Sequence, residues 1–136
     1  MLLEWREYPQ RLTRRDSRYS LENFLRAKAY YLAQGPLKDR DSVIIWGAGM
    51  TGRRLSKHLQ RMQIPLTAFV DIDPRKIGRT CRGKPILPPE DLPTWLKRGA
   101  NPVVLAAVGA RNARRLIRKQ LSNMGLCEGK DWWCTA

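Results

Sequence analysis

Apolar residues follow two different periods along the chain, and each period predicts one kind of element. Short continuous apolar runs, rich in Val, Leu and Ala, predict buried strands at 43–46, 66–70 and 102–108. Over 51–63 and 110–124 the apolar residues instead recur about every three or four positions, which predicts amphipathic helices. The residues of the later helix expected to face the core are Ala113, Leu116, Ile117, Gln120, Leu121 and Met124.

Weaker patterns surround these elements. Apolar residues at helical spacing predict a helix over 21–33, which Gly35-Pro36 ends, and a short helix is expected around 89–97. Residues 131–135 could add a last strand. The polar segment over 73–86 is expected to be a long excursion without regular structure.

The order of strand, helix and strand predicts the fold class. Such alternation builds a parallel sheet covered by helices on both faces. We expect an α/β, three-layer Rossmann-like domain with a short parallel sheet over 41–136, about half of a full doubly wound fold. Residues 1–40 are expected to form an N-terminal arm and helix, and the sequence leaves open whether this helix docks on its own domain.

A glycine triplet follows the first strand and opens the next helix. Gly47 permits a tight turn, Gly49 lets a pyrophosphate approach the backbone, and Gly52 lets the helix lie close to the strand. The helix then directs its free amide groups at the anion. The residues expected to contact a nucleotide here are Gly47, Ala48, Gly49, Met50, Thr51 and Gly52. The alternative is a glycine turn that serves packing alone.

Two carboxylates follow the second strand. Asp71 is placed to accept both ribose hydroxyls of an adenosine and to repel a 2′-phosphate, which favours NAD over NADP. Arg75 and Lys76 weaken that argument because they could tolerate a phosphate. Asp73 is a further candidate contact, and it also fits a turn cap before Pro74. Together the two carboxylates spell the DxD pattern of metal-dependent glycosyltransferases, but their place after a glycine loop argues against a metal site.

The end of the third strand supplies the last candidates. Gly109 and Arg111 are expected to emerge at the same sheet edge as the glycine loop, near the point where open α/β sheets bind ligands. Arg111 could contact a phosphate or a carboxylate, or it could be one more solvated arginine.

The net charge of +14 suggests a nucleic-acid partner. The basic residues, however, cluster on the sides of the two long helices that carry no apolar positions. We therefore interpret most of this charge as solvated helix surface and expect no nucleic acid, with a basic module for anionic partners as the remaining alternative.

The sequence contains no recognisable catalytic set. A Tyr-x-x-x-Lys pair and a G-x-S-x-G elbow are both absent, so no catalytic residue is assigned. The three cysteines show no CxxC spacing and His58 is the only histidine, which argues against a metal. No apolar run is long enough for a transmembrane segment and no secretory leader is evident, so the protein is expected to be cytoplasmic.

Three stretches carry a family resemblance: WGAGMTGRRLSKHL, AFVDIDPRKIGRTCRGKPI and VVLAAVGARNARRLIRKQL, with DWW near the end. Together they resemble the Rossmann-like domain at the C-terminal end of some bacterial family 2 glycosyltransferases. More distantly, the chain is similar to the nucleotide-binding domains of sugar O-acyltransferases and nucleoside-diphosphate-sugar dehydratases.

The resemblance implies a nucleotide-binding accessory domain of a larger protein. It implies an upstream glycosyltransferase domain that acts on sugar-nucleotides, and NAD or another adenine or uridine nucleotide, or a nucleotide-sugar, as the ligand. An alternative is a component of a sugar-nucleotide oxidoreductase or dehydratase whose catalytic residues lie on another domain or chain. Homo-oligomerisation stays open.

Overall fold

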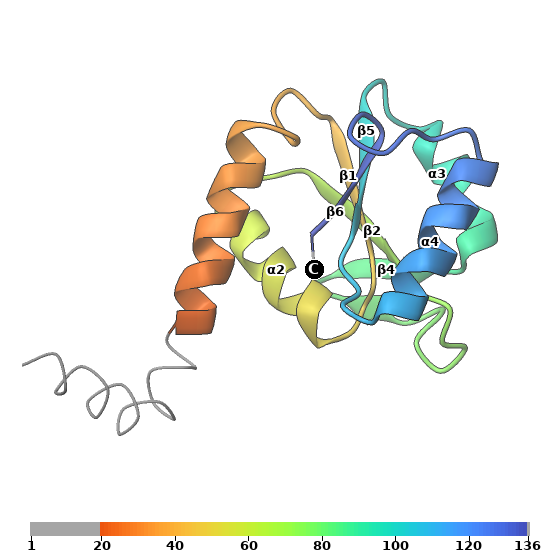
Figure 1. Cartoon of the computed structure of the whole chain (residues 1–136), viewed down its shortest axis with the longest axis horizontal. Coiled ribbons are helices and arrows are strands. Elements are labelled where there is room, and N and C mark those ends of the chain that lie inside the picture. Colours follow the sequence, from red (N-terminus) through yellow and green to blue (C-terminus); the bar gives the residue numbers. More distant parts are fainter. Residues whose placement is uncertain (1–19, 136) are drawn as a thin grey trace, which may run out of the picture.

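The structure, a computed structural model, describes residues 20–135 as one sheet with helices on both faces (Figure 1). The predicted arm over 1–19 lies outside the described residues. The strands are β1 (Ser42–Trp46), β2 (Leu66–Val70), β3 (Thr80–Cys81), β4 (Lys84–Leu87), β5 (Pro102–Ala106) and β6 (Trp132–Cys134). The helices are one over 20–34, then α2 (Met50–Arg61), the 3-10 turn η1 (Pro89–Asp91), α3 (Leu92–Leu96) and α4 (Arg111–Asn123).

The sheet has six strands in the order β3-β4-β2-β1-β5-β6. All neighbours pair in parallel except β3 and β4, which form an antiparallel hairpin. The parallel strands end at one edge, and the crossover helices begin there. The predicted Rossmann-like α/β fold is therefore confirmed.

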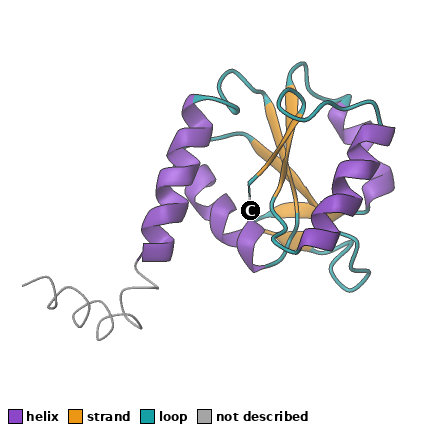
Figure 2. Cartoon of the chain, in the orientation of Figure 1, coloured by secondary structure: helices purple, strands orange, loops and turns teal. Residues whose placement is uncertain are grey.

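The central strand β1 explains why the sequence shows a continuous apolar run there. Alternate side chains point to opposite faces of a sheet. Val43 and Ile45 pack into the core under the helix 20–34 and α2, whereas Ile44 and Trp46 pack into the core under α3 and α4 (Figure 2). A strand buried on both faces has no polar side.

The helix over 20–34 docks on its own domain, which the sequence left open. Ala29 and Leu32 belong to the same buried cluster as β1 and α2. His58, which is buried on α2, hydrogen-bonds to Glu22 with 3.0 Å between Nε2 and Oε2. Lys28 Nζ donates to the carbonyl of Thr135. Among the residues that the structure describes, no helix is long and apolar enough to cross a membrane.

Two predictions need correction. The segment over 73–86 is not an irregular excursion, because it contains the β3–β4 hairpin and β4 extends the sheet beside β2. Three of the α4 residues predicted to face the core are not buried in it: Leu116 and Gln120 are exposed, and Ala113 is half-buried. Met124 is half-buried and packs against the core cluster as predicted. Ile117 and Leu121 are buried as predicted.

Candidate functional site

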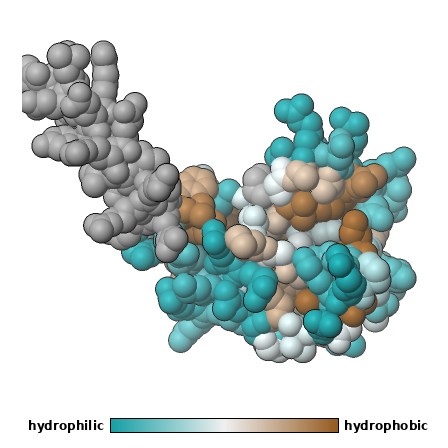
Figure 3. Space-filling view, turned by 90° about the horizontal axis from the view of Figure 1, so that it is seen from below, coloured by the Kyte–Doolittle hydropathy of each residue, from teal (hydrophilic) through white to brown (hydrophobic). Residues whose placement is uncertain are grey.

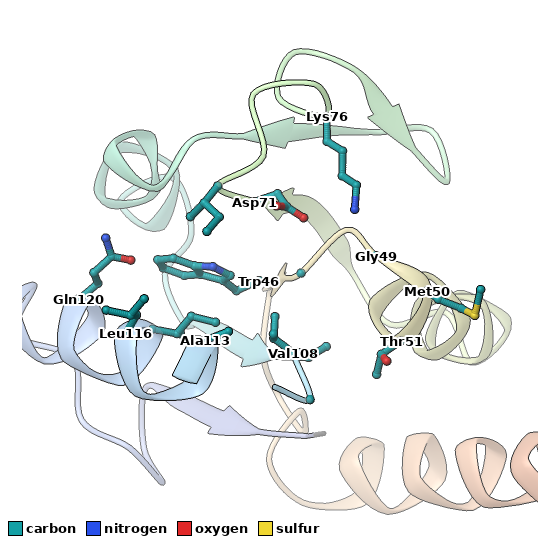
Figure 4. Close-up of a pocket in the computed structure, with 15 residues that line it drawn as sticks. Trp46, Gly49, Met50, Thr51, Asp71, Lys76, Val108, Ala113, Leu116 and Gln120 are labelled. Carbon is teal, nitrogen blue, oxygen red and sulfur yellow. The ribbon is translucent and has the colours of Figure 1, made fainter. Parts of the chain in front are cut away.

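A cavity of about 430 Å³ lies where β1, β2 and β5 end. The glycine loop forms one side, the end of β2 a second and the exposed face of α4 a third (Figure 4). Its lining residues are Trp46, Gly47, Gly49, Met50, Thr51, Asp71, Ile72, Lys76, Ala107, Val108, Gly109, Ala113, Leu116, Ile117 and Gln120. The cavity therefore occupies the edge at which open α/β sheets bind ligands.

Two of the loop glycines are required by the fold. Gly47 has φ +124°, and a Cβ there would lie 2.9 Å from the carbonyl oxygen of Ala107. A Cβ on Gly52 would lie only 1.9 Å from the carbonyl oxygen of Gly47. These two positions make the tight turn and the close helix–strand contact that the sequence predicts.

Gly49 is different, because no contact with another described residue requires it to be glycine. Its φ of −83° suits any residue, and a Cβ would have Lys76 Nζ as its nearest neighbour, at 3.7 Å. Gly49 lines the cavity, so a side chain there would project into the space above the loop. Packing against the described residues therefore does not account for this glycine.

The first turn of α2 offers backbone donors to that space. Gly49 caps the helix without a side-chain hydrogen bond, and the first turn holds no acidic residue. The first amides of a helix have no intrahelical partner and carry the positive end of the helix dipole. This arrangement suits an anion such as a pyrophosphate.

Asp71 is fixed against the loop by its own carboxylate. Oδ2 accepts a hydrogen bond from the Ala48 amide at 2.9 Å, and Oδ1 accepts one from the Asp73 amide at 3.0 Å. A carboxylate can accept about four hydrogen bonds, so acceptor positions remain for ribose hydroxyls. In Figure 4, Asp71 and Lys76 lie on the same side of the cavity, above Gly49.

The opposite part of the cavity is apolar. Trp46 is buried beneath it, Val108 faces it from the loop after β5, and Leu116 faces it from α4 (Figure 4). Three large apolar side chains around it are unusually exposed: Met50 by 67%, Ile72 by 64% and Leu116 by 58%. Figure 3, which views the molecule from below, shows apolar side chains gathered among hydrophilic ones. An apolar cavity with a few polar groups is typical of small-molecule sites.

Of the predicted contacts, six line the cavity: Gly47, Gly49, Met50, Thr51, Asp71 and Gly109. Ala48 contributes through its amide, which holds Asp71. Gly52 lies beneath the loop, in contact with Gly47.

The other two predicted contacts lie elsewhere. Asp73 Oδ1 accepts hydrogen bonds from the amide of Arg75 at 2.9 Å and from its Nε at 3.4 Å, so it caps the turn. The hydrogen bond from the Arg75 amide is the main reason why the pKa of Asp73 is lowered. Arg111 lines a separate polar cavity of about 270 Å³ with Arg114, Arg115 and Arg118.

Sequence reasoning missed most of the apolar wall and Lys76 as a lining residue. The signal for the α4 part was present, because Ala113, Leu116 and Gln120 share the predicted inward face. The apolar periodicity assigns these residues to the core. Periodicity indicates that one face of a helix is covered, but it does not show whether protein or ligand covers that face.

A second, basic cavity of about 360 Å³ adjoins the first one. We call it the basic cavity, and its lining residues are Ala48, Gly49, Met50, Arg53, Arg54, Lys76 and Arg82. Gly49, Met50 and Lys76 line both cavities. Among the described residues that line the basic cavity, none is acidic.

A parallel sheet whose central strand turns through a glycine loop into a crossover helix defines the Rossmann-like class of domains. Within that class, the chain belongs to the CoA binding domain family, whose model matches residues 38–123. No protein of curated function matches the sequence.

Solved structures support the fold. RSP, a Rex-family repressor, has a TM-score of 0.58 and 20% identity over 76% of this chain and 48% of its own. RSP in complex with β-NADH has a TM-score of 0.53 and 21% identity over 68% of this chain and 44% of its own. RSP has also been solved with β-NAD⁺ and operator DNA. This chain therefore spans about half the length of RSP.

A UDP-D-quinovosamine 4-dehydrogenase from Vibrio fischeri is also similar. It has a TM-score of 0.54 and 26% identity over 62% of this chain and 72% of its own. Neither RSP nor this dehydrogenase is named as a glycosyltransferase, and the CoA binding domain family is not described as one.

Proposed function

We propose that this domain binds an adenine nucleotide of the NAD or CoA type at the cavity above the glycine loop, and that it binds without turnover. The observation that carries the proposal is Gly49, which lines the cavity and has no packing reason to be glycine. Family membership and the Rossmann-like fold support the same class of ligand.

Each part of such a nucleotide has a matching part of the cavity. The pyrophosphate is expected over Gly49 at the first amides of α2, and the ribose hydroxyls beside the Asp71 carboxylate. The base then lies in the apolar part, between Ile72, Val108 and Leu116. Among the described residues that line this cavity, none is a histidine, cysteine, serine or tyrosine.

Tryptophan fluorescence tests the proposal directly, because Trp46 lines the cavity. NADH, NADPH, CoA and UDP-glucose are titrated separately, and calorimetry confirms each saturable signal. We expect saturable binding of an adenine nucleotide. Gly49→Val should weaken it by at least about tenfold, because the side chain fills the space of the phosphates.

The control is Gly35→Val, since Gly35 lies far from the cavity along the chain and its Cβ would meet only the Tyr31 carbonyl oxygen, at 3.7 Å. It should leave the affinity unchanged. Flat titrations for all four ligands, or equal weakening by both variants, would show that the glycines serve the fold alone.

The second part of the proposal concerns the larger protein in which this domain acts. The resemblance to the C-terminal domain of family 2 glycosyltransferases supports an accessory role beside a glycosyltransferase domain, and the similarity to half of RSP supports a domain that acts within a larger protein. The expected result is nucleotide binding that alters the activity of the adjoining domain in the full protein, with no consumption of the nucleotide.

A sugar-nucleotide oxidoreductase component is the second candidate, favoured by the likeness to the UDP-D-quinovosamine 4-dehydrogenase. NADH formation from NAD⁺ and a UDP-sugar, seen only when a catalytic partner chain is added, would support it. A basic module for anionic partners would instead bind with a steep salt dependence that Asp71→Ala does not change.

A further inference from the structure

We propose that the polar cavity on α4 is a second anion site, and that it holds the di- or triphosphate group of a small molecule. We call it the arginine cavity; its volume is about 270 Å³ and its lining residues are Arg111, Arg114, Arg115 and Arg118. It shares no lining residue with the cavity above the glycine loop. This inference therefore goes beyond the proposed function and stands independently of it.

The four arginines form one row along α4. Their spacing of three and four residues places them on the same side of the helix, over about 10 Å of its length. Another side of the same helix lines the nucleotide cavity through Ala113, Leu116, Ile117 and Gln120. The basic cavity is also separate, because it adjoins α2, and α2 packs on the other face of the sheet (Figure 1).

The charges of this row are unfavourable for the helix that carries them. Like charges three or four residues apart on a helix repel one another. Arg111 and Arg114 also lie in the first turn of α4, near the positive end of the helix dipole, where cations are disfavoured. The first turn holds no acidic residue that would offset these effects. An anion in the arginine cavity would reduce both of them.

The protein holds one of the four arginines in a fixed orientation. Arg118 donates twice to the Glu128 carboxylate, from Nε to Oε1 at 3.0 Å and from Nη2 to Oε2 at 3.3 Å. Its guanidinium carbon lies 5.9 Å from the centre of the Trp132 ring. A paired contact of this kind fixes the plane of the guanidinium. Glu128 does not line the arginine cavity, so it orients Arg118 without occupying the site.

The residue type and the volume indicate the class of ligand. Among the described residues that line the arginine cavity, none is acidic or apolar. Arginine binds phosphate oxygens through pairs of parallel hydrogen bonds, and four guanidinium groups suit an anion with several charges. Pockets that enclose a whole drug-sized ligand measure roughly 300–1,000 Å³. The smaller arginine cavity therefore favours a compact phosphate group, with the rest of its molecule in solvent.

Calorimetry on the full chain tests the inference, with inorganic tripolyphosphate as the probe and sulfate as the comparison anion at the same ionic strength. We expect tripolyphosphate to bind saturably and about tenfold or more tightly than sulfate, as charge-assisted hydrogen bonds allow. Competition by UTP distinguishes a nucleoside triphosphate from free polyphosphate as the source of the phosphate group.

Substitutions of one arginine locate the bound probe. Arg115→Gln should weaken binding of tripolyphosphate by about tenfold, and Arg115→Lys by about threefold or more, because lysine keeps the charge but loses the paired hydrogen bonds. Lys119→Gln is the matched control, since it removes a charge from an exposed position of α4 outside the arginine cavity. Arg54→Gln removes a charge from the basic cavity. Both controls should change the affinity by about twofold or less, because salt screens distant charges.

Thermal unfolding separates lost binding from lost structure. Because the arginine row is unfavourable for the ligand-free helix, Arg115→Gln should keep or raise the melting temperature without ligand. Tripolyphosphate should raise the melting temperature of the unsubstituted protein and raise that of Arg115→Gln less.

Several results would overturn the inference. They are the lack of saturable tripolyphosphate binding, equal affinity for sulfate, and weakening by Lys119→Gln or Arg54→Gln as large as that by Arg115→Gln. A DNA duplex that displaces the probe with a steep salt dependence would also overturn it, because the row would then be a nucleic-acid surface. A melting temperature that Arg115→Gln lowers strongly without ligand would show that the row serves the fold.

Discussion

The two long helices, α2 and α4, are alike in sequence and differ in what their apolar faces contact. They have 12 and 13 residues, and each begins without a side-chain cap and without an acidic residue in its first turn. Yet α2 buries Gly52, Leu55, Ser56, His58 and Leu59, whereas α4 buries only Ile117 and Leu121.

The difference lies in what covers each helix. On α2 the helix over 20–34 adds a further layer, through Ala29 and Leu32. On α4 the equivalent area faces the cavity, so Leu116 is left 58% exposed. The apolar face of α2 is covered by the protein itself, whereas the exposed part of the apolar face of α4 would be covered by a bound ligand. An amphipathic pattern can therefore indicate a binding site as well as a core.

The largest expected effect is at Gly52, where α2 contacts the glycine loop. Gly52→Ala places a Cβ 1.9 Å from the Gly47 carbonyl oxygen, and that backbone atom cannot move without distorting the loop. We expect a loss of about 3 kcal/mol or more in the free energy of unfolding, measured by urea denaturation. Gly49→Ala should cost less than about 1 kcal/mol in the same assay. Equal losses would show that Gly49 also serves packing.

The next effect compares one leucine from each helix. Leu55→Ala, at a fully buried position of α2, should lower the free energy of unfolding by about 2–5 kcal/mol. Leu116→Ala on α4 should change it by about 0.5 kcal/mol or less without ligand. Calorimetric titration should then show weaker nucleotide binding for Leu116→Ala. A large loss of stability in the ligand-free Leu116→Ala protein would contradict the comparison.

Hydrogen exchange with a saturating nucleotide should distinguish the helices directly. The amides of α4 are expected to gain protection, since the ligand covers the face that carries Leu116 and Gln120. The amides in the middle of α2, which is already covered, should change less. Equal gains in both helices would indicate global stabilisation without a specific contact at α4.

A smaller effect concerns the attachment of the helix over 20–34 to α2. The hydrogen bond from His58 lowers the pKa of Glu22. A carboxyl group with a lowered pKa in the folded state stabilises it above the ordinary value, and this contribution is lost as the pH falls through the lowered value. The protection factors of the amides in this helix, which correct for the slower intrinsic exchange in acid, should therefore fall as the pH falls. Glu22→Gln removes this pH dependence, while other carboxyl groups such as Asp41 continue to contribute theirs.

Much of the fold could be predicted from the sequence, because its strands are buried on both faces. A continuous apolar run such as 66–70 has few interpretations, and β2 spans those residues. The β3–β4 hairpin could not be predicted in this way. Its strands are only 2 and 4 residues long and include Lys84 and Pro85, so neither composition nor alternation marks them.

The features of the candidate site that depend on local backbone conformation could be predicted from the sequence. The features that depend on tertiary contacts could not. Gly47 was predicted from the tight turn after the first strand, and Asp71 from its position at the end of the second strand. The bond between the Asp71 carboxylate and the Ala48 amide depends on the pairing of β1 with β2, which no local pattern shows. Arg111 was predicted at the correct strand end, but α4 directs it to the cavity with Arg114, Arg115 and Arg118.

The pairing of β1 also determines when the glycine loop can form during folding. The Gly47 amide donates to the Val70 carbonyl, and the Trp46 carbonyl accepts from the Ala107 amide, so the loop needs β2 and β5 on both sides. Val43 pairs with Val103, and contacts so distant in sequence form slowly. We therefore expect competence to bind to be acquired late in folding, once β2 and β5 both flank β1. A bound nucleotide should consequently slow unfolding and leave the folding rate almost unchanged.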